Sequence, residues 1–190
     1  TNLIGHTQVA LSRRRGAPEL EEVLQSNLED LDQLRAIVND MLFLARADQG
    51  EAASGLVRTV LAAEVGKTIE FFEFVLDDLG LAIEIDGDIA AQASINTAQF
   101  RRAMTNLLQN AIQHTQGAAR IDVHIRQAGD LVQIHVSNPG KAIEPRHLPR
   151  LFDRFYRVDS ARRDSGETHG HGLGLAIVKA VANMHGGGVF

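Results

Sequence analysis

The chain has 190 residues, of which 44% are hydrophobic and 23% are charged, a composition typical of a globular protein and not of a disordered one. The formal net charge is −5, and proteins that bind nucleic acid usually have a clustered basic surface, so the charge gives no indication of nucleic-acid binding. The chain has no cysteine, which excludes disulfides and thiolate metal sites, and no apolar run of about 18 residues that could cross a membrane.

The first part of the chain predicts a helical hairpin. Residues 1–14 have helical apolar spacing and end at three arginines, whose charge complements the dipole at a helix C-terminus. Gly16 and Pro18 then end this helix and begin a second one, from about residue 19 to residue 47. The second helix carries a coiled-coil-like seam in alternating steps of four and three. Its members are Leu20, Leu24, Asn27, Leu31, Leu34, Val38, Met41 and Ala45.

Two helices cannot bury this seam by themselves, so we expect two chains to associate as a four-helix bundle. The alternative is a hairpin within one chain that packs on the following domain. The small, polar segment Asp48–Gly55 marks a domain boundary. We therefore expect a helical unit at residues 1–49, a linker at residues 50–55 and a second domain at residues 56–190.

The second domain mixes helices and strands, which predicts an α+β fold. We expect a short strand at Leu56–Val60, a helix over residues 61–79 and an alternating strand at Leu81–Ile85. Two more strands follow, joined by a hairpin at residues 127–130. Their inward faces are Ile121, Val123 and Ile125 on one strand, and Val132, Ile134 and Val136 on the other. His124 and His135 fall on the opposite face, where solvated side chains are expected and a metal site is the alternative.

The helix that follows Asn96 organises the domain. Asn96 and Gln99 have the spacing of an N-terminal cap. One face of the helix is apolar, through Phe100, Met104, Leu107, Leu108 and Ala111. Another face is a polar stripe, made of Asn106, Asn110, Gln113 and His114. Amide oxygens in register suit Mg²⁺ and a bound phosphate, while the alternative is that these side chains only face solvent.

The last part of the chain predicts a lid and a phosphate-binding helix start. Residues 138–171 have little periodicity, and a loop of that length is either disordered or a functional lid. Glycines then open a helix that runs from about residue 173 to residue 184, where backbone N–H groups and the helix dipole suit a phosphate. Neither the Walker nor the Rossmann template fits this glycine pattern. His169 and His171 are expected to be hydrophilic lid residues, with metal capture as the alternative.

Four ordered motifs resemble those of the ATP-binding domain of two-component sensor histidine kinases. They are Asn106 with Asn110 (N box), Val136–Gly140 (G1 box), Phe152–Arg157 (F box) and Gly170–Leu175 (G2 box). The hairpin before them resembles the dimerisation and histidine-phosphotransfer domain of the same family. The sequence of residues 151–159 is also similar to that of the heavy-metal-sensing subgroup. The resemblance implies a dimeric four-helix bundle followed by an α/β two-layer sandwich of the histidine-kinase ATPase type.

The resemblance also implies an ATP site. Asn110 would coordinate Mg²⁺ between the phosphates, Asn106 would lie one turn before it, and His114 would lie beside the nucleotide. Gln113 stands where the family usually has Lys or Arg. Gly140 would let the backbone approach the adenine. Further residues implied to contact the nucleotide are Ala142, Phe155, Tyr156, Arg157, Gly170, Gly172, Leu173, Gly174 and Leu175.

Two asparagines depart from what related ATPases carry. Asn138 replaces the usual Asp of the adenine site, and the loss of a charge-assisted hydrogen bond would cost about 1 kcal/mol. Asn106 replaces the Glu that activates water in gyrase-like and chaperone-like hydrolases, and an amide cannot act as a base. Asn106 disfavours an ATP hydrolase. Gln113 and Asn138 leave another alternative, a nucleotide-degenerate dimeric scaffold or phosphatase that docks a response regulator.

The histidine that accepts the phosphoryl group is implied to lie about two helical turns before Thr1, so we do not expect the chain to autophosphorylate. Residues 186–190 have the pattern of a strand that is only beginning, and we therefore expect the chain to be truncated at both ends. His6 lacks the acidic residue and the proline that follow such a histidine, and is expected to be an ordinary surface residue. The implied partners are a second copy, through residues 1–47, and the receiver domain of a response regulator. The implied location is the cytoplasmic side of the bacterial inner membrane, with attachment only through a missing N-terminal part.

Overall fold

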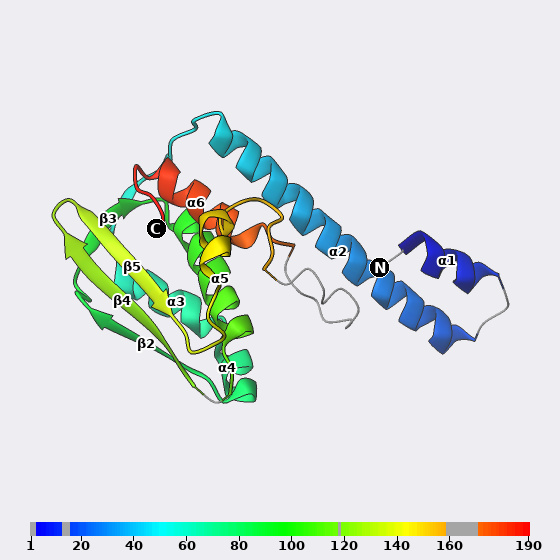
Figure 1. The fold of residues 1–190 in the computed structure, drawn as a ribbon. Coiled ribbons are helices and arrows are strands. Elements are labelled where there is room, and N and C mark those ends of the chain that lie inside the picture. Colours follow the sequence, from blue (N-terminus) through cyan, green and yellow to red (C-terminus); the bar gives the residue numbers. More distant parts are fainter. Residues whose placement is uncertain (1–2, 13–15, 118, 159–170) are drawn as a thin grey trace. The chain divides into compact units, whose positions relative to one another are not determined.

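The computed structural model describes residues 3–12, 16–117, 119–158 and 171–190 (Figure 1). The chain divides into two compact units, Thr1–Phe43 and Leu44–Phe190. This division lies inside the long second helix, and the linker expected at residues 50–55 stays a prediction. In the described part of the chain, no helix has both the length and the apolar character that a membrane span needs.

The first unit contains the two expected helices, α1 (Leu3–Leu11) and most of α2 (Ala17–Asp48). Pro18 lies in the first turn of α2, where the missing N–H of proline costs no helix hydrogen bond. The polar member of the seam, Asn27, donates a hydrogen bond to the Thr7 hydroxyl over 3.1 Å. The large apolar members of the seam are exposed: Leu20, Leu24, Leu31, Leu34, Val38 and Met41.

The second unit contains two small sheets. β2 (Ala82–Gly87) pairs in parallel with β4 (Arg120–Ala128), which pairs antiparallel with β5 (Leu131–Ser137). β1 (Val57–Val60) pairs antiparallel with β3 (Gln92–Ile95). Helices cover one face of the three-stranded sheet (Figure 1). They are α3 (Leu61–Glu70), α4 (Glu73–Leu79) and α5 (Thr97–His114). A 3₁₀-helix, η1 (Pro145–Arg150), and α6 (Gly174–Met184) complete the described elements.

Two local expectations need correction. The helix expected over residues 61–79 is two helices, α3 and α4, separated at Phe71 and Phe72. Clustered phenylalanines lose side-chain freedom in a helix, which weakens helix propensity at this point. β3 was not expected, because its four residues are too few to show an alternating pattern and its stability comes from pairing with β1.

The core lies between α5 and the central strand. Ile121, Val123 and Ile125 of β4 are fully buried, as their alternation predicts. Met104 and Leu108 of α5 pack in the same core cluster. His124 and His135 are register partners on the outer face, and His124 Nδ1 lies 2.5 Å from Asp86 Oδ1. Among the described residues, no group of three His, Cys, Asp or Glu side chains could hold a metal ion.

The cap of α5 forms as expected. The Asn96 side-chain oxygen accepts a hydrogen bond from the Gln99 backbone N–H over 3.0 Å. The amide nitrogen of Asn96 donates to the Ser54 carbonyl over 2.8 Å, and its backbone N–H donates to His185 Nε2 over 3.0 Å. Asn96 therefore fixes the start of α5 against both the segment before β1 and the end of α6.

A buried carboxylate joins α3 to α5. Glu64 is 4% exposed and forms ion pairs with Lys67 at 2.6 Å and with Arg101 at 3.0 Å. The hydrogen bond from Lys67, followed by that from Arg101, lowers the pKa of the Glu64 carboxyl below its ordinary value, although burial opposes this shift.

This pKa makes the stability of the domain depend on pH. Since the pKa of Glu64 is lower in the folded protein, its stabilisation is complete above the ordinary glutamate pKa of about 4.3 and is lost as the pH falls through the lowered value. We expect Glu64→Gln to lower the free energy of unfolding by about 1–3 kcal/mol at neutral pH. Urea denaturation at neutral pH and at about pH 3 measures this, and a difference between wild type and variant that does not shrink in acid contradicts it.

Candidate functional site

The polar stripe of α5 is the framework of the candidate site. Asn106 and Asn110 are half-buried, whereas Gln113 and His114 are exposed. An α-helix rises about 1.5 Å per residue, so Asn106 and His114 lie about 12 Å apart along the helix axis. Asn110 lies midway between them and on the same face. The stripe is therefore a rigid row with one asparagine amide at its centre.

At the Asn106 end, the stripe meets the start of α6. The Asn106 amide nitrogen donates to the Arg102 carbonyl over 2.8 Å, which fixes the orientation of this amide. A Cβ atom on Gly174 would lie 2.7 Å from the Asn106 Oδ1, so only glycine allows this close packing. Among the residues that the structure describes, no side chain caps the N-terminus of α6. Its first N–H groups and the positive end of its dipole are therefore available to an anion.

At the His114 end, the stripe meets the turn after β5. A Cβ atom on Gly140 would collide with the His114 carbonyl oxygen, and it would lie 3.3 Å from the Asn138 amide nitrogen. The Gln116 N–H donates to the Pro139 carbonyl over 3.2 Å, which holds the turn against the end of α5. The backbone from Asn138 to Gly140 thus lies at one end of the stripe, and Gly174, the first residue of α6, lies at the other.

Residues 152–157, which follow η1, pack on Gly172. Phe155 has a positive φ of 61°, which is rare for a bulky residue, and its N–H donates to the Gly172 carbonyl over 2.8 Å. Gly172 itself has φ of +70°, and a Cβ atom there would lie 2.9 Å from the Phe155 carbonyl carbon. The Tyr156 hydroxyl lies 2.5 Å from His147 Nδ1 of η1, and the Arg150 guanidinium lies 4.3 Å from the centre of the Tyr156 ring.

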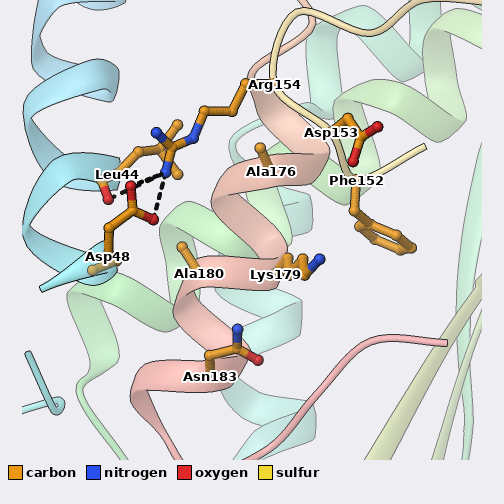
Figure 2. A pocket seen from close by; sticks show the side chains of 10 residues that line it. Leu44, Asp48, Phe152, Asp153, Arg154, Ala176, Lys179, Ala180 and Asn183 are labelled. Atoms are coloured by element: carbon orange, nitrogen blue, oxygen red, sulfur yellow. Dashed lines mark hydrogen bonds and ion pairs between the residues drawn. The ribbon is translucent and has the colours of Figure 1, made fainter. Parts of the chain in front are cut away.

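A cavity of about 360 Å³ lies beside this segment (Figure 2). Arg154 donates to both carboxylate oxygens of Asp48, at 2.5 and 2.6 Å, and to the Leu44 carbonyl at 3.5 Å. This pair joins the last turn of α2 to residues 152–157. The cavity is lined by Leu44, Ala47, Asp48, Phe152, Asp153, Arg154, Ala176, Lys179, Ala180 and Asn183. These residues include no member of the α5 stripe, so the cavity is not the candidate site.

The remaining expected site residues differ in how far they are buried. Leu173 is buried at the start of α6 and Leu175 is half-buried, so both help to anchor the helix. Ala142 and Arg157 are exposed, and Phe155 points more than half of its surface to solvent. Gly170 and His169 lie outside the described residues. Sequence patterns did not identify the roles of His147, Arg150 or Asp48, because their partners are set by loop geometry and not by periodicity.

The donor set suits Mg²⁺ held on a phosphate. Mg²⁺ takes oxygen ligands and usually keeps water and substrate phosphates in its coordination shell, with only one or two ligands from the protein. Asn110 offers one amide oxygen at the centre of the stripe, and no carboxylate belongs to the stripe. The site therefore fits a metal that arrives with a nucleotide better than a metal held by the protein alone.

Comparisons with known proteins match this chain to an ATPase family and to curated sensor kinases. Residues 95–190 match the family described as "Histidine kinase-, DNA gyrase B-, and HSP90-like ATPase". Sensor histidine kinase CusS of Escherichia coli strain K12 is 47% identical over 189 residues, which cover 100% of this chain and 39% of that protein. Sensor protein CopS of Pseudomonas syringae pv. tomato is 37% identical over 185 residues, 97% of this chain and 38% of that protein. This chain thus spans less than half the length of these curated relatives.

Solved structures share the fold. The Acinetobacter baumannii histidine kinase AdeS matches with a TM-score of 0.76 and 20% identity, over 96% of this chain and 82% of that one. Full-length ShkA, solved in complex with AMPPNP, matches with a TM-score of 0.73 and 21% identity, over 92% of this chain and 35% of that one. The resemblance to sensor histidine kinases and the expected α+β fold are thereby confirmed.

Proposed function

Because this chain belongs to the family of histidine kinase-, DNA gyrase B- and HSP90-like ATPases, we propose that it binds ATP with Mg²⁺ as the catalytic core of a sensor kinase. In this proposal the kinase transfers the γ-phosphoryl group to a histidine, and from there to an aspartate of a response regulator. The observation that carries the proposal is the α5 stripe, which places Asn110 between two close glycine contacts, Gly140 at one end and Gly174 at the other.

Each end of the stripe takes a different part of the nucleotide. The turn at Asn138 and Gly140 would receive the adenine, with His114 beside it. The uncapped N-terminus of α6 would receive the phosphates through its backbone N–H groups. Bound Mg²⁺ would supply charge neutralisation for the phosphates, and Asn110 would orient it.

Phosphoryl transfer to a side chain fits the site better than hydrolysis does. The Asn106 amide nitrogen is already committed to the Arg102 carbonyl, and its oxygen faces Gly174. An amide cannot take a proton from water near neutral pH, so this position provides no general base. Positioning and electrostatic stabilisation suffice for phosphoryl transfer to a nucleophile that another part of the protein presents.

The partners follow from the first unit and from the relatives. The exposed apolar seam of α2 supports a homodimer through residues 1–47. The receiver domain of a response regulator is the proposed acceptor, because the relatives are sensor kinases. We extend the proposal to a response to heavy-metal ions and to a location on the cytoplasmic side of the bacterial inner membrane. The attachment to the membrane would be provided by an N-terminal part of the intact protein.

A scaffold with a degenerate nucleotide site is the second candidate. It is favoured by one observation: the exposed Gln113 on α5 has an amide where the family usually has a cation for phosphate. Titration calorimetry with ATP, with and without Mg²⁺, separates the two functions. Mg²⁺-dependent binding with little steady-state phosphate release supports the kinase core. No binding supports the scaffold, and rapid phosphate release supports a hydrolase.

We expect Asn138→Asp to raise the affinity for ATP severalfold and to increase its preference over GTP. A carboxylate accepts a stronger, charge-assisted hydrogen bond from the adenine amino group than an amide does, by about 1 kcal/mol. Titration of ATP and GTP against wild type and variant measures both effects. Unchanged affinity and selectivity would show that Asn138 does not contact the base.

A further inference from the structure

The contact between His147 and Tyr156 joins η1 to residues 152–157, which follow it. The Nδ1 atom of His147 lies 2.5 Å from the Tyr156 hydroxyl, and both residues are partly buried. Arg150, also in η1, lies over the Tyr156 ring at 4.3 Å. Two side chains of one short helix therefore hold the same tyrosine, one at its polar end and one at its ring face.

The neighbouring arginine selects the tautomer of His147. Arg146 Nε lies 3.3 Å from His147 Nε2, and an arginine can only donate. The Nε2 atom must then carry a lone pair, so the proton of the neutral ring is on Nδ1. His147 therefore donates to the Tyr156 oxygen. Arg146 also pairs with Glu144 at 3.0 Å, which holds the guanidinium in this place.

The tyrosine follows a strained residue. Phe155 has φ of 61°, a conformation that costs a bulky L-residue about 1–2 kcal/mol and persists only where its surroundings enforce it. The Phe155 N–H bonds to the Gly172 carbonyl at 2.8 Å, and the Tyr156 N–H bonds to the Asp153 carbonyl at 3.3 Å. The Tyr156 side chain is a further anchor of this turn, and His147 holds it.

This turn also fixes residues 172–174, the glycine segment at the start of α6. The Phe155 and Tyr156 backbone lies so close to Gly172 that a Cβ atom there would lie within 2.9–3.1 Å of three of its atoms. Two residues later, Gly174 lies against Asn106 of the stripe. A continuous series of contacts therefore runs from His147, through Tyr156 and Gly172, to the end of the stripe assigned to the phosphates.

We propose that His147 is a positioning residue for the nucleotide: through the Tyr156 hydroxyl, it keeps the strained turn against Gly172 and so keeps the start of α6 in the form that binds phosphate. His147 itself does not touch the nucleotide. This inference rests on the proposed function, because it assigns a supporting residue to the same ATP site.

The test is a double-mutant cycle in the whole chain, with Mg²⁺ and AMPPNP as the probe in titration calorimetry. His147→Leu and Tyr156→Phe should each weaken binding about fivefold to tenfold, and the double variant should be no weaker than either one, because both remove the same bond. His147→Asn should bind within about twofold of wild type, because the amide of asparagine can replace Nδ1 in this bond. His135→Leu, on the outer face of β5, is the control for the same change at a site outside this series.

The outcomes separate this inference from the proposed function. Failure of the wild-type chain to bind AMPPNP overturns the proposed function. Binding by wild type with equal affinity in His147→Leu overturns the inference alone, even if the variant unfolds at a lower temperature. Additive losses in the double variant, or no recovery in His147→Asn, also overturn it. Tyr156→Phe removes a single oxygen, so it provides the affinity comparison if His147→Leu does not fold.

Discussion

Replacing Asn110 with Ala is expected to weaken Mg²⁺-dependent ATP binding by about 100-fold, the cost of one lost interaction with a charged group. Asn110 lies at the centre of the α5 stripe, between the Gly174 contact and the Gly140 contact. In the proposed function its amide oxygen would hold the metal. Its removal should leave the residues at the two ends of the stripe in place and weaken only the metal-dependent part of the binding. Titration calorimetry in Mg²⁺ and in EDTA measures the effect.

Two further variants make the test of Asn110 specific. Gln109→Ala changes the exposed neighbour of Asn110 on α5, outside the stripe, and should leave the affinity unchanged. Asn110→Asp keeps an oxygen ligand and should retain more Mg²⁺-dependent binding than Asn110→Ala. Equal affinities of wild type and Asn110→Ala in Mg²⁺, or an equal loss in EDTA, would refute a role in metal binding.

Gly172→Ala is expected to weaken ATP binding by at least tenfold and to lower the free energy of unfolding by about 1–3 kcal/mol. The new Cβ atom would meet the Phe155 carbonyl carbon at 2.9 Å and its Cα at 3.0 Å. Both are backbone atoms, so the strained turn has to move. The same turn contacts the segment that begins α6. Its movement should therefore displace the start of α6, where the phosphates are proposed to bind.

Gly186→Ala is the matched control for Gly172→Ala. Gly186 has φ of +73°, close to the +70° of Gly172, but a Cβ atom there would have no neighbour within 4 Å. The control therefore adds the same backbone strain without the collision, and it should lose stability but keep its affinity for ATP. Calorimetry with ATP and thermal unfolding measure the pair. If both variants lose affinity equally, the effect comes from strain and not from the contact with Phe155.

Periodicity predicted most of the framework. The alternation in β4 identified its buried face, and the helical spacing in α5 identified both the core face and the polar stripe. The cap at Asn96 was also predictable, because it depends on two residues three positions apart. These features are local, so a single stretch of sequence contains all of the residues that make them.

The features that the sequence did not predict depend on distant or irregular contacts. β3 is stable because it pairs with β1, more than thirty positions away. The bond from His147 to Tyr156 depends on a positive φ at Phe155, a conformation that no phenylalanine adopts by preference. The contact of Gly174 with Asn106 joins two motifs that are local patterns in themselves, but their meeting depends on how α6 packs against α5.

The helical construction of the stripe also limits how this segment can vary. Each residue of an α-helix turns the chain by about 100°, so one inserted or deleted residue between Asn106 and His114 would turn one end of the stripe by that angle relative to the other. Substitutions on the other faces of α5 leave this alignment intact. The positions that contact Gly174 and Gly140 are therefore set by the number of residues between Asn106 and His114, and we expect natural variation in this stretch to change side chains but never the number of residues.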